Sequence, residues 1–289
     1  MKKVLLIILI LVVAALPVAF AACSRAAQST RLSTGYVCSK DGYELFTYDA
    51  FYKETKIGTM TMKFSPLDKD TISLPDPTKE GDYVAEYTGT LLETSLTVTD
   101  GLLGEKEPKA GDSLVSYVLY GGDFAPTYSY KKTIVDGVTK EMQVVYEGKY
   151  AYTKLYENGK ETASAKLKVS GAYDNEMIYA LARASVIDDS SYSFSFKTPN
   201  ALTSSLESIA ITKSENTEVA VPCFEGEKTA CIRFAVSTNN KYASSHHLTI
   251  ASSKQKVTDE HGTEVMLTKP ITSITEGDIK YNLISVEID

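Results

Sequence analysis

The sequence contains no tryptophan, only three histidines and only four cysteines among its 289 residues. So few histidines leave little material for a metal site. His246 and His247 are adjacent, and on a strand their rings would point to opposite faces. His261 lies in Asp259-Glu260-His261-Gly262, a run that is typical of a turn. We therefore interpret the three histidines as surface residues and expect no metal ion.

Basic residues are also scarce. Lys and Arg together number 30 against 37 Asp and Glu, which gives a formal net charge of -7 at neutral pH. An acidic chain of this kind is a poor partner for nucleic acid, because the phosphate backbone attracts basic surfaces. We expect no nucleic-acid partner.

No residue pattern points to a reaction. The glycines are scattered at predicted turns, without the closely spaced run that cradles a phosphate. No serine lies in the sharp strand-to-helix turn that a hydrolase nucleophile needs. We therefore predict no catalytic residues, no cofactor and no enzymatic activity.

The amino terminus has the pattern of a secretory signal peptide. Lys2 and Lys3 precede an apolar run from Val4 to Leu16, and Pro17 and small residues follow. Residues 1–22 are therefore predicted to be removed on export, which places the protein in the periplasm or at the outer membrane. An uncleaved membrane anchor is the alternative, because residues 4–22 are nearly long enough to span a bilayer. Pro17 and the small residues favour cleavage.

Two cleavage sites fit this segment. Phe20-Ala21-Ala22-Cys23 resembles a bacterial lipobox, with Phe where Leu is usual, and in that case Cys23 becomes the lipid-modified first residue. We favour this lipoprotein reading, in which residues 23–41 form a polar tether and the lipid anchors the chain to a membrane. The alternative is an ordinary signal peptidase cut before Ala22. The even number of cysteines favours that alternative, because lipid on Cys23 would leave Cys38 unpaired.

The rest of the chain has the pattern of β-strands. Ser191–Phe196 and Ser208–Ile211 alternate strictly between apolar and polar or small residues, a period typical of strands with one dry and one wet face. Asp136-Gly137 and Asn158-Gly159 are dipeptides that two-residue hairpin turns favour. The pattern predicts a mainly β fold: one large, curled antiparallel sheet, or half-barrel, in a single domain of residues 42–289. Two long loops are expected at Ser65–Gly81 and Gly101–Gly111.

One segment, Tyr173–Ser185, predicts a short helix. Asp174 can cap its first amides, and Met177, Ile178 and Leu181 form an apolar stripe at spacings of three and four. So short a helix is marginal in water, and we expect it to pack this stripe on the sheet. Tyr179 lies off the stripe. Capping and the helix dipole account for Asp174 and Arg183, so neither is assigned to a site.

A disulfide is predicted between Cys223 and Cys231. In a hairpin centred on Glu227 the two residues would lie directly opposite each other on one face, at a separation that a bridge requires. An exported protein also meets oxidising conditions.

Several segments resemble an uncharacterised family of exported bacterial proteins, the domain of unknown function 3108. The resemblance spans about residues 42–287 and implies an open β half-barrel with a helix on its concave side, similar to the LolA-like periplasmic carriers of lipoproteins. The family has no established catalytic residues to carry over. Ser237–Asn240 departs from the acidic segment usual there. The matching segments are Tyr48–Tyr52, Ile57–Met62, Ser116–Val118, Ala125–Ser129, Tyr173–Ala184, Val221-Pro222 and Cys231–Phe234.

Two functions from different classes follow. The first is a non-enzymatic envelope protein whose concave face binds an apolar or lipid-like ligand. The second is a structural or interaction domain at the cell envelope without a small-molecule ligand. A solvent-connected apolar concave face would favour the first, and a concave side filled by the protein's own side chains would favour the second.

Overall fold

The structure is a computed structural model that describes residues 32–33, 42–78, 82–102, 107–187, 192–225, 227–239, 246–259 and 261–289. The predicted signal peptide, Cys23 and Cys38 lie outside the described residues. So does most of the predicted tether. Leu32 and Ser33, the described part of that tether, contact the folded domain: Leu32 is buried, and the Ser33 amide donates to the Ala184 carbonyl at 2.8 Å.

The described chain is mostly strand with one helical segment. The strands of the main sheet are β1 (Glu44–Tyr52), β2 (Thr55–Pro75), β3 (Asp82–Val98), β4 (Ser113–Tyr120), β5 (Pro126–Val135), β6 (Val138–Glu147), β7 (Tyr150–Glu157), β8 (Lys160–Lys168), β9 (Ser193–Asn200), β10 (Ser205–Val219), β11 (Thr229–Thr238), β12 (His246–Ala251), β15 (Ile271–Glu276) and β16 (Ile279–Ile288). A 3-10 turn, η1 (Asn175–Met177), leads directly into helix α2 (Ile178–Ala184). Strands β13 (Gln255–Thr258) and β14 (Glu264–Leu267) form a separate hairpin.

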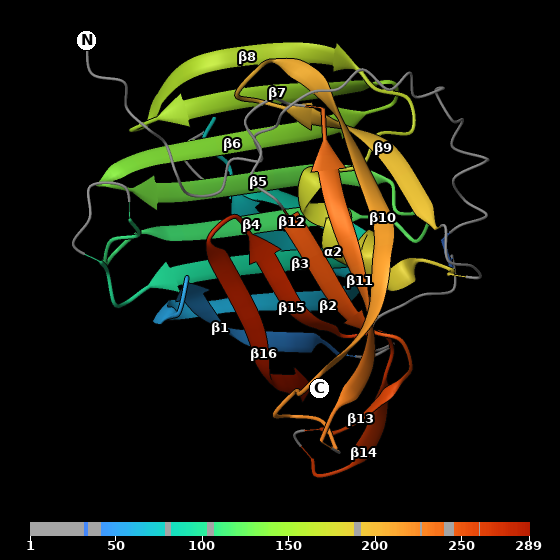
Figure 1. Cartoon of the computed structure of the whole chain (residues 1–289). Helices are drawn as coiled ribbons and strands as arrows, with labels where there is room; N and C mark the ends of the chain where they lie inside the picture. Colours follow the sequence, from blue (N-terminus) through green and yellow to red (C-terminus); the bar gives the residue numbers. More distant parts are fainter. Residues whose placement is uncertain are drawn as a thin grey trace.

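The main sheet is antiparallel and curls nearly into a closed barrel (Figure 1). Its order is β8-β7-β6-β5-β4-β3-β2-β1-β16-β15-β12-β11-β10-β9, so that β8 and β9 are the two edges. The expected fold class is confirmed, and the sheet closes further than the expected half-barrel: one unsealed seam remains, between β8 and β9.

The two predicted hairpin turns are confirmed. Asp136 and Gly137 join β5 to β6 with φ values of 52° and 74°, and Asn158 and Gly159 join β7 to β8 with 50° and 78°. Both positions of each turn therefore have the left-handed backbone that Asp, Asn and Gly tolerate best.

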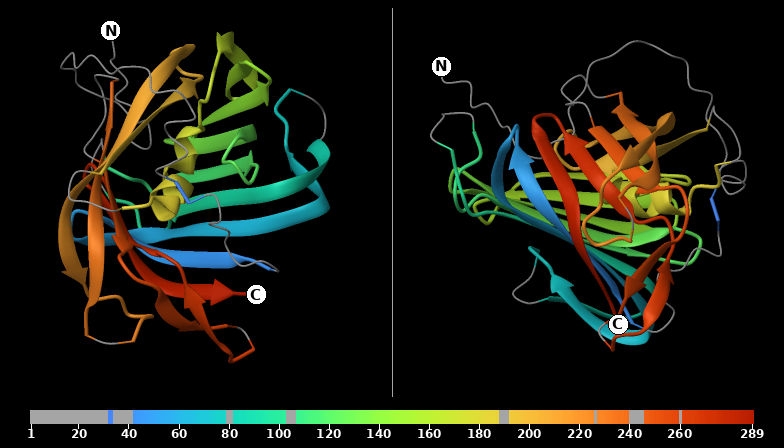
Figure 2. Two further views of the ribbon diagram at one scale, coloured as in Figure 1. Left: turned by 90° about the vertical axis from the view of Figure 1, so that its right-hand side faces the viewer. Right: turned by 60° about the horizontal axis from the view of Figure 1, so that its bottom comes forward.

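The prediction of a long loop over Ser65–Gly81 is wrong. Strand β2 continues to Pro75 and pairs with β3 as far as Asp82. The far end of this hairpin is ordered because it covers the outer face of the barrel, where its Ile72 and Leu74 share an apolar cluster with Tyr128 and other side chains of β3–β5. Tyr128 also donates its hydroxyl to the Pro75 carbonyl at 2.5 Å. Figure 2 shows the hairpin, in cyan, curving beyond the neighbouring strands.

Helix α2 lies inside the barrel, and all seven of its residues are buried. Met177, Ile178 and Leu181 belong to the core cluster that also contains the inward side chains of β1–β4 and β9–β12, such as Phe46, Phe64 and Phe234. Tyr179 differs from the expectation. It is only 3% exposed, because the strands surround the helix and leave no face in water. The helix therefore packs against the barrel on all of its faces and not only along the predicted apolar stripe.

Candidate functional site

Polar side chains gather inside the barrel around η1. Asp174 begins the turn as predicted, with its Oδ1 accepting from the Glu176 amide at 3.1 Å. Its Oδ2 accepts from the Ser129 hydroxyl of β5 at 2.6 Å and from the Tyr146 hydroxyl of β6 at 2.9 Å. Burial raises the pKa of the Asp174 carboxyl, and these donors oppose the shift. Asp174 therefore joins the helix to the barrel wall as well as capping it.

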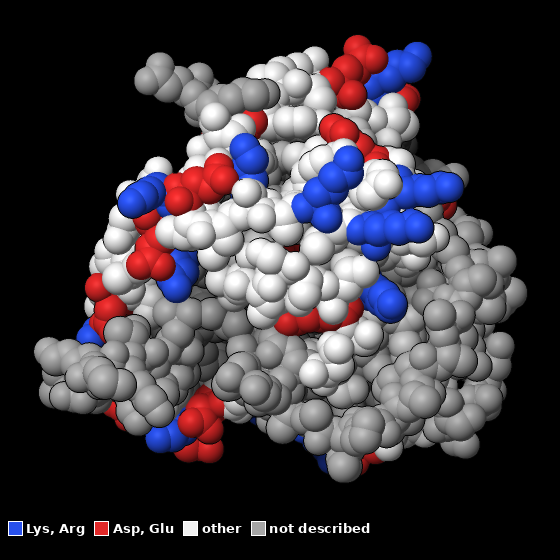
Figure 3. Space-filling view, turned by 90° about the horizontal axis from the view of Figure 1, so that it is seen from above, with Lys and Arg blue, Asp and Glu red and all other residues white. Residues whose placement is uncertain are grey.

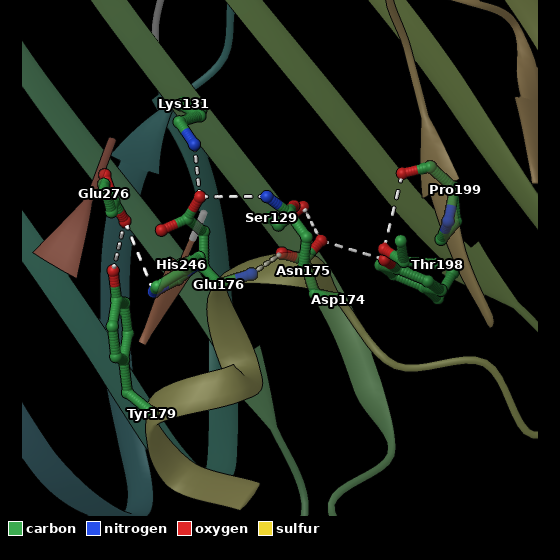
Figure 4. Close-up of polar contacts among 11 residues, drawn as sticks. Ser129, Lys131, Asp174, Asn175, Glu176, Tyr179, Thr198, Pro199, His246 and Glu276 are labelled. Carbon is green, nitrogen blue, oxygen red and sulfur yellow. Dashed lines mark hydrogen bonds and ion pairs between the residues drawn. The ribbon is translucent and has the colours of Figure 1, made fainter. Parts of the chain in front are cut away.

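Glu176 forms a buried ion pair with Lys131 of β5 and also accepts from the Asn175 amide group at 3.0 Å. Both charged side chains are largely removed from water. The ion pair connects η1 to β5, the strand whose Ser129 also donates to Asp174 (Figure 4). Because a buried charge is costly without a partner, the two groups depend on each other.

Glu276 of β15 is a third carboxyl near the η1 turn, and the charges of Glu176 and Lys131 both act on it. Burial is the largest effect on this carboxyl and raises its pKa to about 7, with the charge of Glu176 adding to the shift and that of Lys131 opposing it. Tyr179 of α2 points its hydroxyl at Glu276 Oε1, at 3.5 Å. Figure 4 shows these groups on one side of the η1 turn.

His246 of β12 is also part of this cluster, which corrects our interpretation of it as a surface residue. It is 3% exposed, and its Nε2 lies 3.6 Å from Glu276 Oε1. Burial lowers the pKa of His246 to about 3, and nearby His247 and Lys131 lower it further. The ring is therefore neutral at physiological pH. Within the described chain, neither ring nitrogen has a hydrogen-bond partner.

A small pocket of about 70 Å³ borders this cluster. One wall comes from β5 and β6, the opposite wall from β9, β10 and their connecting turn, and η1 lies between them. Its charged lining residues are Asp174, Glu176, Glu207 and Lys131. We call it the η1 pocket. Its size and its polar lining differ from the extended apolar face that a carrier of acyl chains would need.

The η1 cluster predicts a pH-dependent stability. Because the folded-state pKa of Glu276 lies above its ordinary 4.5, the stability contributed by its neutral form is complete below about pH 4.5 and is lost as the pH rises through about 7. The depressed pKa of His246 acts in the opposite direction at lower pH, and Glu176, Lys131 and Tyr179 also face Glu276.

The measurement is therefore a difference. We expect the wild type to lose more unfolding free energy than Glu276→Gln between pH 5 and pH 8, because Gln cannot ionise. Urea denaturation of both proteins at the two pH values measures this difference. Glu215→Gln, on the exposed side of β10, is the control and should show no such difference. Parallel pH profiles for Glu276→Gln and the wild type would contradict the assignment.

Arg183 is a second buried charge that sequence reasoning assigned only to the helix dipole. Its Nη1 lies 2.7 Å from Glu44 Oε2, and neither side chain is accessible to more than a few per cent. Its guanidinium carbon also lies 4.8 Å from the ring centres of Phe46 and Phe64. Nη2 donates to the Thr268 carbonyl at 2.9 Å. The end of α2 is thus bound to β1, β2 and the segment before β15.

The predicted disulfide is absent: Cys223 and Cys231 are both free thiols. Strands β10 and β11 pair only up to Val219 and Thr229, and in this register Cys231 faces Thr217 rather than Cys223. Cys223 lies in the connection between the strands. Burial raises the pKa of both thiols, that of Cys223 to about 11. The prediction of a hairpin centred on Glu227, with Cys223 opposite Cys231, is therefore wrong.

Sequence signals for the η1 cluster were weak. Only the position of Asp174 before the helix was recognisable, since a capping residue has a local pattern. His246 and Glu276 lie opposite each other on the paired strands β12 and β15, and Lys131 of β5 comes near them only because the sheet curls into a barrel. Within the described residues, no group of three His, Cys, Asp or Glu side chains could hold a metal ion. No described helix is long and apolar enough to cross a membrane.

Comparisons with known proteins assign no family to the chain. No family model matches the chain, and no curated protein matches it. Among solved structures, the chain is similar to a β-barrel-like protein of domain of unknown function DUF1849 from Brucella abortus. The two share 11% sequence identity with a TM-score of 0.49, over 86% of this chain and 98% of that one. The resemblance to domain of unknown function 3108 and to lipoprotein carriers stays a prediction.

Proposed function

We propose that this chain is a non-enzymatic, exported interaction domain of the cell envelope, anchored through lipid on Cys23. The observation that carries the proposal is the filling of the barrel by the chain's own helix. Met177, Ala180, Leu181 and Ala182 have no exposed surface, so α2 occupies the space in which an apolar ligand would lie. Such a domain meets its partners through its outer surface and through the η1 pocket.

The competing function, carriage of an acyl chain, is less well supported. It would need an apolar face that is open to solvent, and in the described chain the inward side chains of the sheet pack on α2. Among the described residues, the exposed large hydrophobic side chains are Val84 of β3, Tyr150 of β7 and Met266 of β14, which lie on three different strands. From above, acidic and basic side chains are interspersed on the described surface (Figure 3).

The packed interior predicts the outcome of a ligand-uptake experiment. The folded protein should not take up an apolar fluorescent dye saturably, and a fatty acid should displace none, because α2 and the inward side chains of the sheet pack against each other where such a ligand would lie. Fluorescence titration of the native protein measures this, with urea-unfolded protein as the control for non-specific dye binding. Stoichiometric uptake that a fatty acid reverses would favour the carrier instead.

The lipid anchor makes an independent prediction. Wild-type protein should sediment with the membrane fraction, and a Cys23→Ala variant should not, because its chain has no acceptor for the lipid. Mass spectrometry of the native amino terminus is the direct measurement. An unmodified terminus at Ala22 would contradict the anchor and support the ordinary signal peptidase cut.

A further inference from the structure

The carboxyl end of helix α2 is completed by a segment from far away in the sequence. The last carbonyls of a helix have no partners within it. Ser185 satisfies two of them, because its amide donates to the Ala182 carbonyl at 3.3 Å and its hydroxyl donates to the Leu181 carbonyl at 2.8 Å. The Ala184 carbonyl accepts instead from the Ser33 amide, at 2.8 Å. Ala184 is 1% exposed, so losing this donor would leave a buried carbonyl unsatisfied.

Leu32, the residue before Ser33, adds a side chain to this contact. It is 5% exposed and belongs to the main core cluster, as Leu181 and Ala184 do. Ser185 leaves the helix with an extended backbone (φ -59°, ψ 128°) and forms an antiparallel bridge with Leu32. This bridge is isolated and is part of neither described sheet. Residues 32–33 therefore pack on the end of α2 through one apolar side chain and two neighbouring main-chain positions.

The helix end has further contacts that do not involve residues 32–33. The Ser185 hydroxyl accepts from the Tyr192 hydroxyl at 2.7 Å, and the Ser185 carbonyl accepts from the Lys269 ammonium. Arg183 pairs with Glu44, as described above. Withdrawal of residues 32–33 would therefore loosen the last turn of α2 and leave the strand pairing of the barrel intact. A helix of seven residues is marginal in water, so its last turn depends on such outside contacts.

We propose that Leu32 and Ser33 form a latch, which holds the last turn of α2 in the barrel while docked and releases it when the amino-terminal segment is displaced. The predicted tether, residues 23–41, thereby controls the helix that fills the barrel. A partner that binds the tether, or tension along it, opens this end of the interior. The latch goes beyond the proposed function, and it operates with either predicted cleavage site, because both leave Leu32 in the chain.

The test is hydrogen exchange of the native protein, extracted in mild detergent and followed by mass spectrometry. Ser33→Pro removes the amide donor and keeps Leu32. We expect the amides of residues 181–185 to exchange about tenfold faster than in the wild type, because the last turn opens more often. The amides of β3 and β4 should exchange as in the wild type. Ser33→Ala is the matched control: it keeps the amide and changes an exposed side chain, so its exchange should equal that of the wild type.

Leu32→Asp tests the side chain. It should speed exchange in residues 181–185 by about tenfold or more, because it places a charge at an apolar site. Val84→Asp, at a side chain that is 62% exposed, adds the same charge and should have no such effect. Circular dichroism must show that Leu32→Asp is folded; if it is not, Leu32→Ala takes its place.

Unchanged exchange of residues 181–185 in Ser33→Pro or in the Leu32 variant would overturn the latch. So would a parallel rise across α2, β3 and β4, because Leu32 and Ser33 would then support the whole fold and not the helix end. Neither result depends on lipidation or on dye uptake by the wild type, which test the proposed function separately.

Discussion

An Arg183→Met variant is expected to lose about 3–5 kcal/mol of folding free energy, the range for breaking a buried ion pair. The substitution leaves Glu44 buried beside an apolar side chain, at the position where the guanidinium now lies 2.7 Å from its carboxylate. It also removes the donor to the Thr268 carbonyl. Urea denaturation followed by circular dichroism measures the change.

Arg233→Met is the matched control, because Arg233 pairs with Glu215 at 3.1 Å on the outside of the barrel with both side chains well exposed. That variant should lose less than about 1 kcal/mol. The double variant Glu44→Gln/Arg183→Met should recover part of the loss, since it no longer buries an unpaired charge. Similar losses of folding free energy in Arg183→Met and Arg233→Met would show that the buried ion pair contributes no more to stability than the exposed one.

Leu181→Ala is expected to cost about 2–5 kcal/mol, the usual range for truncating a fully buried leucine. Leu181 has no exposed surface and lies in the main core cluster. The barrel encloses α2 on all sides, so Tyr179→Ser should also be strongly destabilising, by about 3–5 kcal/mol, the range for losing a large buried aromatic ring. The same denaturation experiment measures both variants.

Two milder variants provide the comparison. Tyr179→Phe keeps the ring and loses only the 3.5 Å contact to Glu276, so its cost should be about 1 kcal/mol or less. Val84→Ala, at a side chain that is 62% exposed, should change stability by less than about 0.5 kcal/mol. If Leu181→Ala unfolded at the same urea concentration as Val84→Ala, the helix would not be part of the core.

Local patterns predicted the parts of this fold that depend on neighbouring residues. The turns at Asp136-Gly137 and Asn158-Gly159 need a particular backbone at two consecutive positions, and few residue types supply it. The helix after Asp174 has a capping residue and a short apolar period. Such features are decided within a few residues, so a sequence is enough to recognise them.

Features that depend on distant strands were missed. Arg183 looked like a helix-end cation because its partner, Glu44, lies on β1, far away in the sequence. His246 looked like a surface residue because alternation alone does not say which face of β12 turns inward. The hairpin end at Ile72 and Leu74 looked like a loop because its partners belong to the outer face of other strands. Each of these requires the assembled sheet, in which residues that are distant in the sequence come into contact.

The place of β1 in the sheet has a consequence for how the protein reaches its folded state. Strands β1 to β8 follow one another in the sheet as they do in the sequence, so each can pair with the strand before it as the chain emerges. The other side of β1 pairs with β16, and the Asp289 amide reaches back to the Tyr43 carbonyl. Until β16 arrives, that edge of β1 has unpaired amides and carbonyls that another chain could join. This edge of β1 therefore needs protection from other chains, by a chaperone or by rapid folding, until β16 has paired with it.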